Sequence, residues 1–105
     1  MKVDPIAMKK QAGKAHQLLA AMANETRLLI LCQLIDRECS VGEIAELLDA
    51  RQSTISQHLA LLRKDGFVKA RREGQTQFYS LKGNDACAVI ETLHALYCLP
   101  ASRKK

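Results

Sequence analysis

The sequence has no tryptophan, only two tyrosines and two phenylalanines, and few residues that break helices, with five glycines and two prolines among 105 residues. All-β folds need many turns and favour aromatic residues, whereas disordered chains are poor in apolar residues. Here 48% of the residues are hydrophobic. The composition therefore favours a mainly helical fold, and the length favours a single domain around one core.

The sequence also lacks long hydrophobic runs. No segment reaches the roughly 18 apolar residues that a membrane helix requires, and the first five residues lack the apolar part of a secretory signal. We therefore expect a cytoplasmic protein with no membrane partner. The four cysteines include no CxxC pair, and structural disulfides are not expected inside a cell, so each thiol is a packed apolar side chain, a reactive group or a metal ligand.

The formal net charge is +5, with 16 Lys and Arg residues against 11 Asp and Glu residues. Clustered cations attract phosphate and release its counterions, which makes nucleic acid a candidate partner. Part of this charge lies in the segment 99–105, which we expect to be a flexible, solvated tail beyond a core at about 5–98. The basic residues inside the core are more informative.

Apolar residues at helical spacing predict two helices in the first third of the chain. Asp4 and Pro5 favour the start of a helix over about 5–22, because Asp accepts from free amides and proline tolerates the first helical position. Asn24 is a suitable cap for a second helix over about 25–36. That helix has almost no polar face, so we expect it to lie at the centre of the core.

Ser40 and Glu43 have the spacing of a capping box, which predicts a short third helix. A turn at 49–52 leads to a fourth helix with Ser53 as its expected cap. This helix ends at Gly66, since glycine accepts the left-handed conformation that follows many helices. Its apolar face is formed by Ile55, Leu59 and Leu62.

After residue 66 the apolar period changes to two, in 67–72 and again in 76–81, which predicts a β-hairpin. A final helix is expected from about 84 to 97. The order α-α-α-α-β-β-α, with two short helices joined by a tight turn and followed by a basic hairpin, is that of a winged helix-turn-helix domain. It is mainly α-helical with a small hairpin.

The fourth helix is the predicted recognition helix. Opposite its apolar face lie short polar side chains that fit a major groove, and Gln57 can pair with N6 and N7 of adenine. The hairpin tip gathers cationic groups that suit a DNA backbone. The predicted DNA-binding residues are Gln52, Ser53, Thr54, Ser56, Gln57, His58, Lys64, Arg71, Arg72 and Gln75.

Each of these groups has an alternative interpretation. The polar face is also what a solvated helix presents, and the hairpin tip can be an ordinary solvated turn. His58 lies near the buried side and is either packed or bonded to phosphate, whereas Lys64 also offsets the dipole at the helix end. Because a single domain of this size contacts few base pairs, we expect a homodimer through the first and last helices, bound to double-stranded operator DNA.

Several ordered segments resemble the arsenic-repressor (ArsR/SmtB) family. They are Ala23-Asn24-Glu25-Thr26-Arg27-Leu28, Ser56-Gln57-His58-Leu59, Leu62-Arg63-Lys64-Asp65-Gly66-Phe67-Val68 and Arg72-Glu73-Gly74-Gln75. The similarity runs from about 18 to 98. It implies a homodimeric winged-helix repressor, in bacterial cytoplasm, that an inducer releases from its operator.

The family's metal sites are not matched. A Cys-Val-Cys run that ligates soft metals in this family corresponds to Ser40-Val41-Gly42, which leaves only the neighbouring Cys39. In the last helix, Asp85-Ala86-Cys87 has no histidine at the family's offset, and His94 stands alone. Because a metal site needs three or four donors, we expect no metal and no cofactor.

The remaining thiols, Cys32 and Cys98, resemble the thiol-responsive branch of the family, in which one cysteine in each of these helices senses persulfides or oxidants. The resemblance implies that a disulfide or polysulfide between them controls DNA binding, with a reactive sulfur species or an oxidant as inducer. Both can instead be packed core cysteines, and a metal-responsive or constitutive repressor is the alternative. Cys39 and Cys87 are expected to be bystanders, although Cys39 lies near a helix start that can activate a thiolate.

A thiol enzyme is a further alternative, in which one cysteine attacks and the other resolves. Cys32 lies in an apolar helix, which raises a thiol pKa and opposes catalysis. We therefore expect no enzymatic activity.

Overall fold

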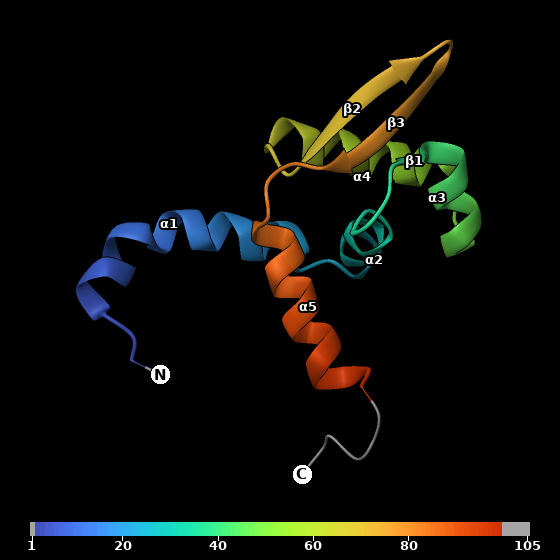
Figure 1. Ribbon diagram of the computed structural model, residues 1–105. Helices are drawn as coiled ribbons and strands as arrows, with labels where there is room; N and C mark the ends of the chain where they lie inside the picture. The colour runs from blue at the N-terminus through green and yellow to red at the C-terminus, as the bar shows by residue number, and fades with distance from the viewer. Residues whose placement is uncertain (1, 100–105) are drawn as a thin grey trace.

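A computed structural model describes residues 2–99 of the chain, and the tail prediction for 100–105 lies outside them. The chain forms a body of helices with a small sheet on one side (Figure 1). In chain order the elements are α1 (Pro5–Met22), α2 (Glu25–Gln33), β1 (Cys39–Ser40), α3 (Val41–Leu48), α4 (Gln52–Lys64), β2 (Val68–Glu73), β3 (Thr76–Leu81) and α5 (Asp85–Tyr97). The predicted mainly helical architecture is confirmed.

One element was not predicted. The two-residue strand β1 makes the hairpin part of a three-stranded antiparallel sheet with the order β1-β3-β2. Cys39 pairs with Tyr79, and Ser40 pairs with Phe78. Two residues are too few to show an alternating pattern, and their partners lie far along the sequence, so the sequence carries no local signal for this strand.

The predicted helix starts are confirmed at three caps. Asp4 Oδ1 accepts from the amide of Ile6 at 3.0 Å, and Asn24 Oδ1 accepts from the amide of Arg27 at 3.0 Å. The capping box is complete, because Ser40 N donates to Glu43 Oε1 at 2.8 Å and Glu43 N donates to Ser40 Oγ at 3.1 Å. Caps of this kind each contribute about 1 kcal/mol to helix stability.

Two predicted helix boundaries were wrong. The second helix ends at Gln33 and not at residue 36, because the amide of Leu34 bonds back to the carbonyls of Leu31 and Cys32 and tightens the last turn. The fourth helix begins at Gln52, with Arg51 at the cap position and no side-chain hydrogen bond. Ser53 therefore lies inside the first turn and does not cap it.

The core lies around α2, as expected. Ile30 and Leu31 are fully buried and Leu34 is 2% exposed, and α4 packs here through side chains that are at most 1% exposed. One side of α2 remains open, however, because Leu29 is 44% exposed. The buried apolar residues are Ala21, Met22, Ile30, Leu31, Leu34, Cys39, Ile44, Ala45, Ile55, Leu59, Leu62, Val68, Ala86 and Ile90.

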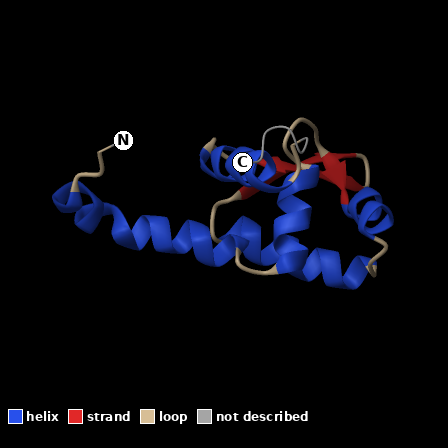
Figure 2. Cartoon of the chain, turned by 90° about the horizontal axis from the view of Figure 1, so that it is seen from below, coloured by secondary structure: helices blue, strands red, loops and turns tan. Residues whose placement is uncertain are grey.

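The two end helices are much less buried. Figure 2 shows the first half of α1 extending away from the rest of the chain. Only Ala21 and Met22 of α1, and only Ala86 and Ile90 of α5, are buried. Among residues 2–99, no helix is long and apolar enough to cross a membrane.

Candidate nucleic-acid interface

The helix α4 presents one apolar and one polar face. Its apolar side chains, Ile55, Leu59 and Leu62, pack into the core. Ser53, Ser56, Gln57 and Lys64 are exposed, and Thr54 and His58 are half-buried between the two faces. The predicted orientation of the helix is therefore confirmed, whereas contacts of these residues with DNA stay a prediction.

His58 has one ring nitrogen that is shielded from solvent. Its Nδ1 is buried and has no hydrogen-bond partner within the described residues. This atom therefore faces protein, and only the other edge of the ring is placed to reach a ligand. The packed interpretation of His58 fits this position better than the interpretation as a phosphate contact.

The start of α4 is open to an anion. Because no side chain caps this helix, its first amides are not occupied by a cap. Amides at a helix start, together with the helix dipole, favour a phosphate oxygen. Gln52 and Ser53 are exposed in this first turn.

The hairpin forms the wing, which projects from the helical body (Figure 1). Gly74 adopts φ +63° in the turn between β2 and β3, where Glu73 pairs with Thr76. Arg72 and Gln75 are exposed here, and Arg72 Nε donates to the carbonyl of Gly74 at 3.1 Å. This bond steadies a cation beside the tip.

Arg71, the other predicted cation of the wing, is already engaged. Its Nε lies 3.1 Å from both carboxylate oxygens of Glu38, and its Nη2 lies 2.8 Å from Glu38 Oε1. A second carboxylate, Glu73, lies 3.7 Å from Nη1, and the guanidinium carbon lies 5.2 Å from the centroid of the Phe78 ring. Hydrogen bonding to Arg71 lowers the pKa of Glu38. No pattern in the sequence indicates this pair, because its members are 33 residues apart.

The two predicted sensor thiols come from α2 and the end of α5. The pKa of Cys32 is raised, first by burial and second by the charge of Cys98. Cys32 is half-buried and Cys98 is exposed. A cavity of about 420 Å³ opens beside Cys32, lined by Cys32, Ile35, Ile90, Glu91, His94, Ala95 and Leu99.

The other two thiols are in settings that disfavour the thiolate. Cys39 is buried, its Sγ donates to the carbonyl of Gln33 at 3.7 Å, and burial raises its pKa. The expectation that a helix start could activate it is therefore not met. The pKa of Cys87 is also raised, first by desolvation and then by the charges of Glu91 and Asp36. Within the described part of the chain, no three His, Cys, Asp or Glu side chains gather as a metal site.

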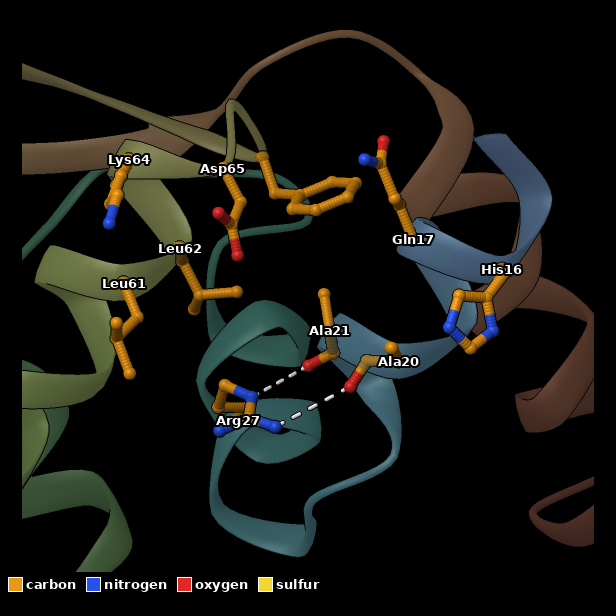
Figure 3. Close-up of a pocket in the computed structure, with 10 residues that line it drawn as sticks. His16, Gln17, Ala20, Ala21, Arg27, Leu61, Leu62, Lys64 and Asp65 are labelled. Atoms are coloured by element: carbon orange, nitrogen blue, oxygen red, sulfur yellow. Dashed lines mark hydrogen bonds between the residues drawn. The ribbon is translucent and has the colours of Figure 1, made fainter. Parts of the chain in front are cut away.

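A larger hollow of about 580 Å³ lies between α1, α2 and the end of α4 (Figure 3). Arg27 forms its floor and bonds to the end of α1, with Nε 2.9 Å from the carbonyl of Ala21 and Nη2 3.4 Å from that of Ala20. The bond to Ala21 satisfies a carbonyl near the helix end, whereas the carbonyl of Ala20 also accepts from the amide of Ala23 at 3.3 Å. Arg27 thus has a structural task that sequence reasoning missed.

Residues 24–70 match the family described as "Bacterial regulatory protein, arsR family". The transcriptional activator HlyU of Vibrio cholerae is 56% identical over 91 residues, which are 87% of this chain and 84% of that protein. A solved structure of reduced HlyU has a TM-score of 0.83 at 55% identity and covers 89% of this chain and 98% of its own. The chain belongs to the arsR family.

Three further matches, two from Xylella fastidiosa and one from Mycobacterium bovis, are similar to this chain. The biofilm growth-associated repressor of Xylella fastidiosa is 34% identical over 87% of this chain and 80% of its own length. The solved structure of the repressor BigR from Xylella fastidiosa has a TM-score of 0.88 at 32% identity, over 93% of this chain and 100% of that one. A homodimeric winged helix-turn-helix DNA-binding domain from Mycobacterium bovis has a TM-score of 0.73 at 29% identity, over 91% and 89%. This arsR-family chain is thus a winged helix-turn-helix transcriptional regulator.

Proposed function

We propose that this regulator is a cytoplasmic, homodimeric repressor that binds operator DNA when its thiols are reduced and leaves it when Cys32 and Cys98 are joined. The observation that carries the proposal is that Cys32 of α2 lines a cavity together with Ala95 and Leu99, which lie close to Cys98 in the sequence at the end of α5. Cys98 is exposed and can meet an incoming oxidant, and Cys32 borders a cavity.

The DNA-binding part of the proposal rests on α4 and the wing. Gln57 lies on the exposed face of α4, where its amide can read an adenine in the major groove. The open start of α4 and the cation of Arg72 supply contacts to the backbone on either side. Base contacts then set specificity and phosphate contacts set register.

The dimer part rests on apolar side chains that the single chain leaves in solvent. Leu19 on α1 is 58% exposed, and Leu96 and Tyr97 on α5 are 58% and 72% exposed. Exposed apolar surface of this kind is what a partner subunit covers. The related domain from Mycobacterium bovis is described as homodimeric, which supports the same assembly here.

An organic persulfide supplies balanced chemistry for the switch. A persulfide RSSH transfers its outer sulfur to one thiol and leaves RSH, and the second thiol then displaces hydrogen sulfide to give a disulfide; a further sulfur donor lengthens the bridge. Burial raises the pKa of Cys32, which disfavours the thiolate that a turnover enzyme needs. A bridge ties α2 to α5, and moving either one shifts the spacing of two recognition helices in a dimer.

The test is fluorescence anisotropy of labelled operator DNA with glutathione persulfide as the donor. Wild type should release the DNA, whereas Cys32→Ser and Cys98→Ser should stay bound. Cys87→Ser is the matched control, because Cys87 is also a half-buried free thiol, and it should behave as wild type. Release of the Cys98→Ser variant at the wild-type donor concentration would exclude the mechanism.

The name of the V. cholerae relative favours a second direction of control, because that protein is called an activator whereas BigR is called a repressor. Transcription in vitro from a promoter that carries the operator separates the two. The proposal expects the reduced protein to lower transcript levels and the persulfide-treated protein to restore them. A rise with the reduced protein would establish an activator with the same DNA interface.

A further inference from the structure

The two neighbouring arginines of the wing lie on opposite faces of the sheet. Side chains alternate along a strand, and residues paired across strands share a face. Arg72 pairs with Gln77, whose Oε1 accepts from Arg63 Nη1 on α4 at 3.5 Å. Arg72 is thus on the side of the recognition helix, and Arg71 is on the other side.

On the face of the sheet that points away from α4, the side chain of Arg71 reaches from β2 across β3. Because the strand order is β1-β3-β2, Arg71 on β2 must cross the central strand to reach Glu38, which directly precedes β1. It does so over Phe78, which pairs with Arg71 on one side and with Ser40 on the other. The forked contact between Arg71 and Glu38 thus ties the edge strand β2 to the residue that precedes the other edge strand, β1.

We propose that Arg71 is a positioning residue and not a phosphate contact, and that with Glu38 it forms a strut which holds the wing at a fixed angle to α4. The proposal rests on the operator binding proposed above. It assigns the phosphate contact of the wing to Arg72. It also gives Glu38, which no DNA-binding pattern in the sequence includes, an indirect role in operator affinity.

The strut has a second consequence, which follows from its place in the chain. Glu38 lies in the segment between α2, which carries Cys32, and β1. The contact between Glu38 and Arg71 therefore links the segment that follows α2 to the hairpin, in addition to the strand pairing of β1.

The geometry of the pair matters more than its charge. An isolated surface ion pair contributes little to stability, but a forked Arg–carboxylate contact fixes orientation as well. Lysine keeps the positive charge of arginine and loses the planar fork. Arg71→Lys therefore separates the two roles, because a phosphate contact tolerates this change and a strut does not.

The test measures operator affinity against salt concentration for wild type, Glu38→Gln, Arg71→Lys, the double variant and Arg72→Gln. The strut predicts that Glu38→Gln and Arg71→Lys weaken binding by a similar factor, about threefold to fivefold, that the double variant is no weaker, and that the salt slope stays at the wild-type value. Arg72→Gln should instead lower the slope by about 0.9, the value for one lost phosphate contact.

Tighter binding by Glu38→Gln, or wild-type affinity for Arg71→Lys, would overturn the strut, because operator binding would then not depend on the forked contact between Arg71 and Glu38. A measurement without DNA distinguishes a failure of the strut from a failure of the proposed operator binding. Hydrogen exchange at the amides of Cys39 and Tyr79, which pair β1 with β3, should quicken in Glu38→Gln and in Arg71→Lys. Unchanged exchange overturns the strut, and a wild-type protein that binds no DNA overturns only the proposed function.

Discussion

The DNA-binding part of the molecule, which consists of α3, α4 and the wing, buries its apolar side chains to a very different degree from the two end helices, α1 and α5. Ile55 and Leu59 of α4 are fully buried, whereas Ile6 of α1 is 73% exposed and Tyr97 of α5 is 72% exposed. The first part has its own core within one chain, although Leu47 of α3 and Leu61 of α4 remain 52% and 51% exposed, and it leaves polar groups for a ligand. The end helices α1 and α5 leave apolar side chains exposed, so we expect a second subunit to cover them. Substitutions there should therefore affect assembly more than folding.

The largest expected effect is therefore at the ends. Leu19→Glu places a charge in the apolar face that α1 offers to a partner, and Leu19 is 58% exposed, so the fold itself should persist. We expect a monomer by analytical ultracentrifugation and a loss of operator affinity of about 100-fold, because one half-site binds far more weakly than two.

Leu47→Glu is the matched control, because Leu47 on α3 is 52% exposed and lies outside the end helices. This variant should keep the wild-type oligomeric state. A dimeric Leu19→Glu, or a monomeric Leu47→Glu, would mean that the exposed face of α1 is not the interface.

A smaller effect is expected on the polar face of α4. Gln57→Ala removes the amide that we assign to an adenine, so the affinity for operator relative to random DNA should fall by about 1–3 kcal/mol. Competition binding measures this ratio. Gln11→Ala, on an exposed part of α1, should leave it unchanged. Equal losses on operator and random DNA would show that Gln57 contacts only the backbone.

The caps provide a further comparison within the DNA-binding part. Ser40→Ala breaks the capping box of α3 and should lower the free energy of unfolding by about 1 kcal/mol in urea. Ser53→Ala should change it much less, since Ser53 caps no helix in the structure. A larger loss of stability for Ser53→Ala than for Ser40→Ala would mean that Ser53 caps α4, as the sequence predicted.

The smallest effect concerns the thiols. The charge of Cys98 raises the pKa of Cys32, so Cys98→Ser should shift the alkylation of Cys32 by iodoacetamide to lower pH. The shift should be partial, because burial is the larger cause and remains. Cys87→Ser should leave the profile in place. If Cys98→Ser also left it in place, the two thiols would not interact.

Local patterns predicted most of the fold. Asp4, Asn24 and the pair Ser40 and Glu43 act within a few residues, and the structure shows the hydrogen bonds that their spacing predicted. The failures have physical causes. No spacing rule separates a serine that caps a helix from one inside its first turn, which is why Ser53 was misplaced.

The features that escaped prediction all depend on distant residues. The strand β1 exists only because β3 pairs with it, and Glu38 meets Arg71 only because that sheet forms. Sequence reasoning could place Arg71 at the wing, but it could not show that a carboxylate already holds it. The burial of Cys39, which removes the predicted activation of its thiol, depends on the same fold.

Control of the DNA-binding part by the thiols of α2 and α5 is tested most directly by tandem mass spectrometry. A persulfide donor first divides the protein into DNA-bound and released fractions, and each fraction is then digested and analysed. We predict a peptide with Cys32 linked to Cys98, through two or more sulfurs, in the released fraction and not in the bound one. Released protein in which both thiols are free and unmodified would contradict this control.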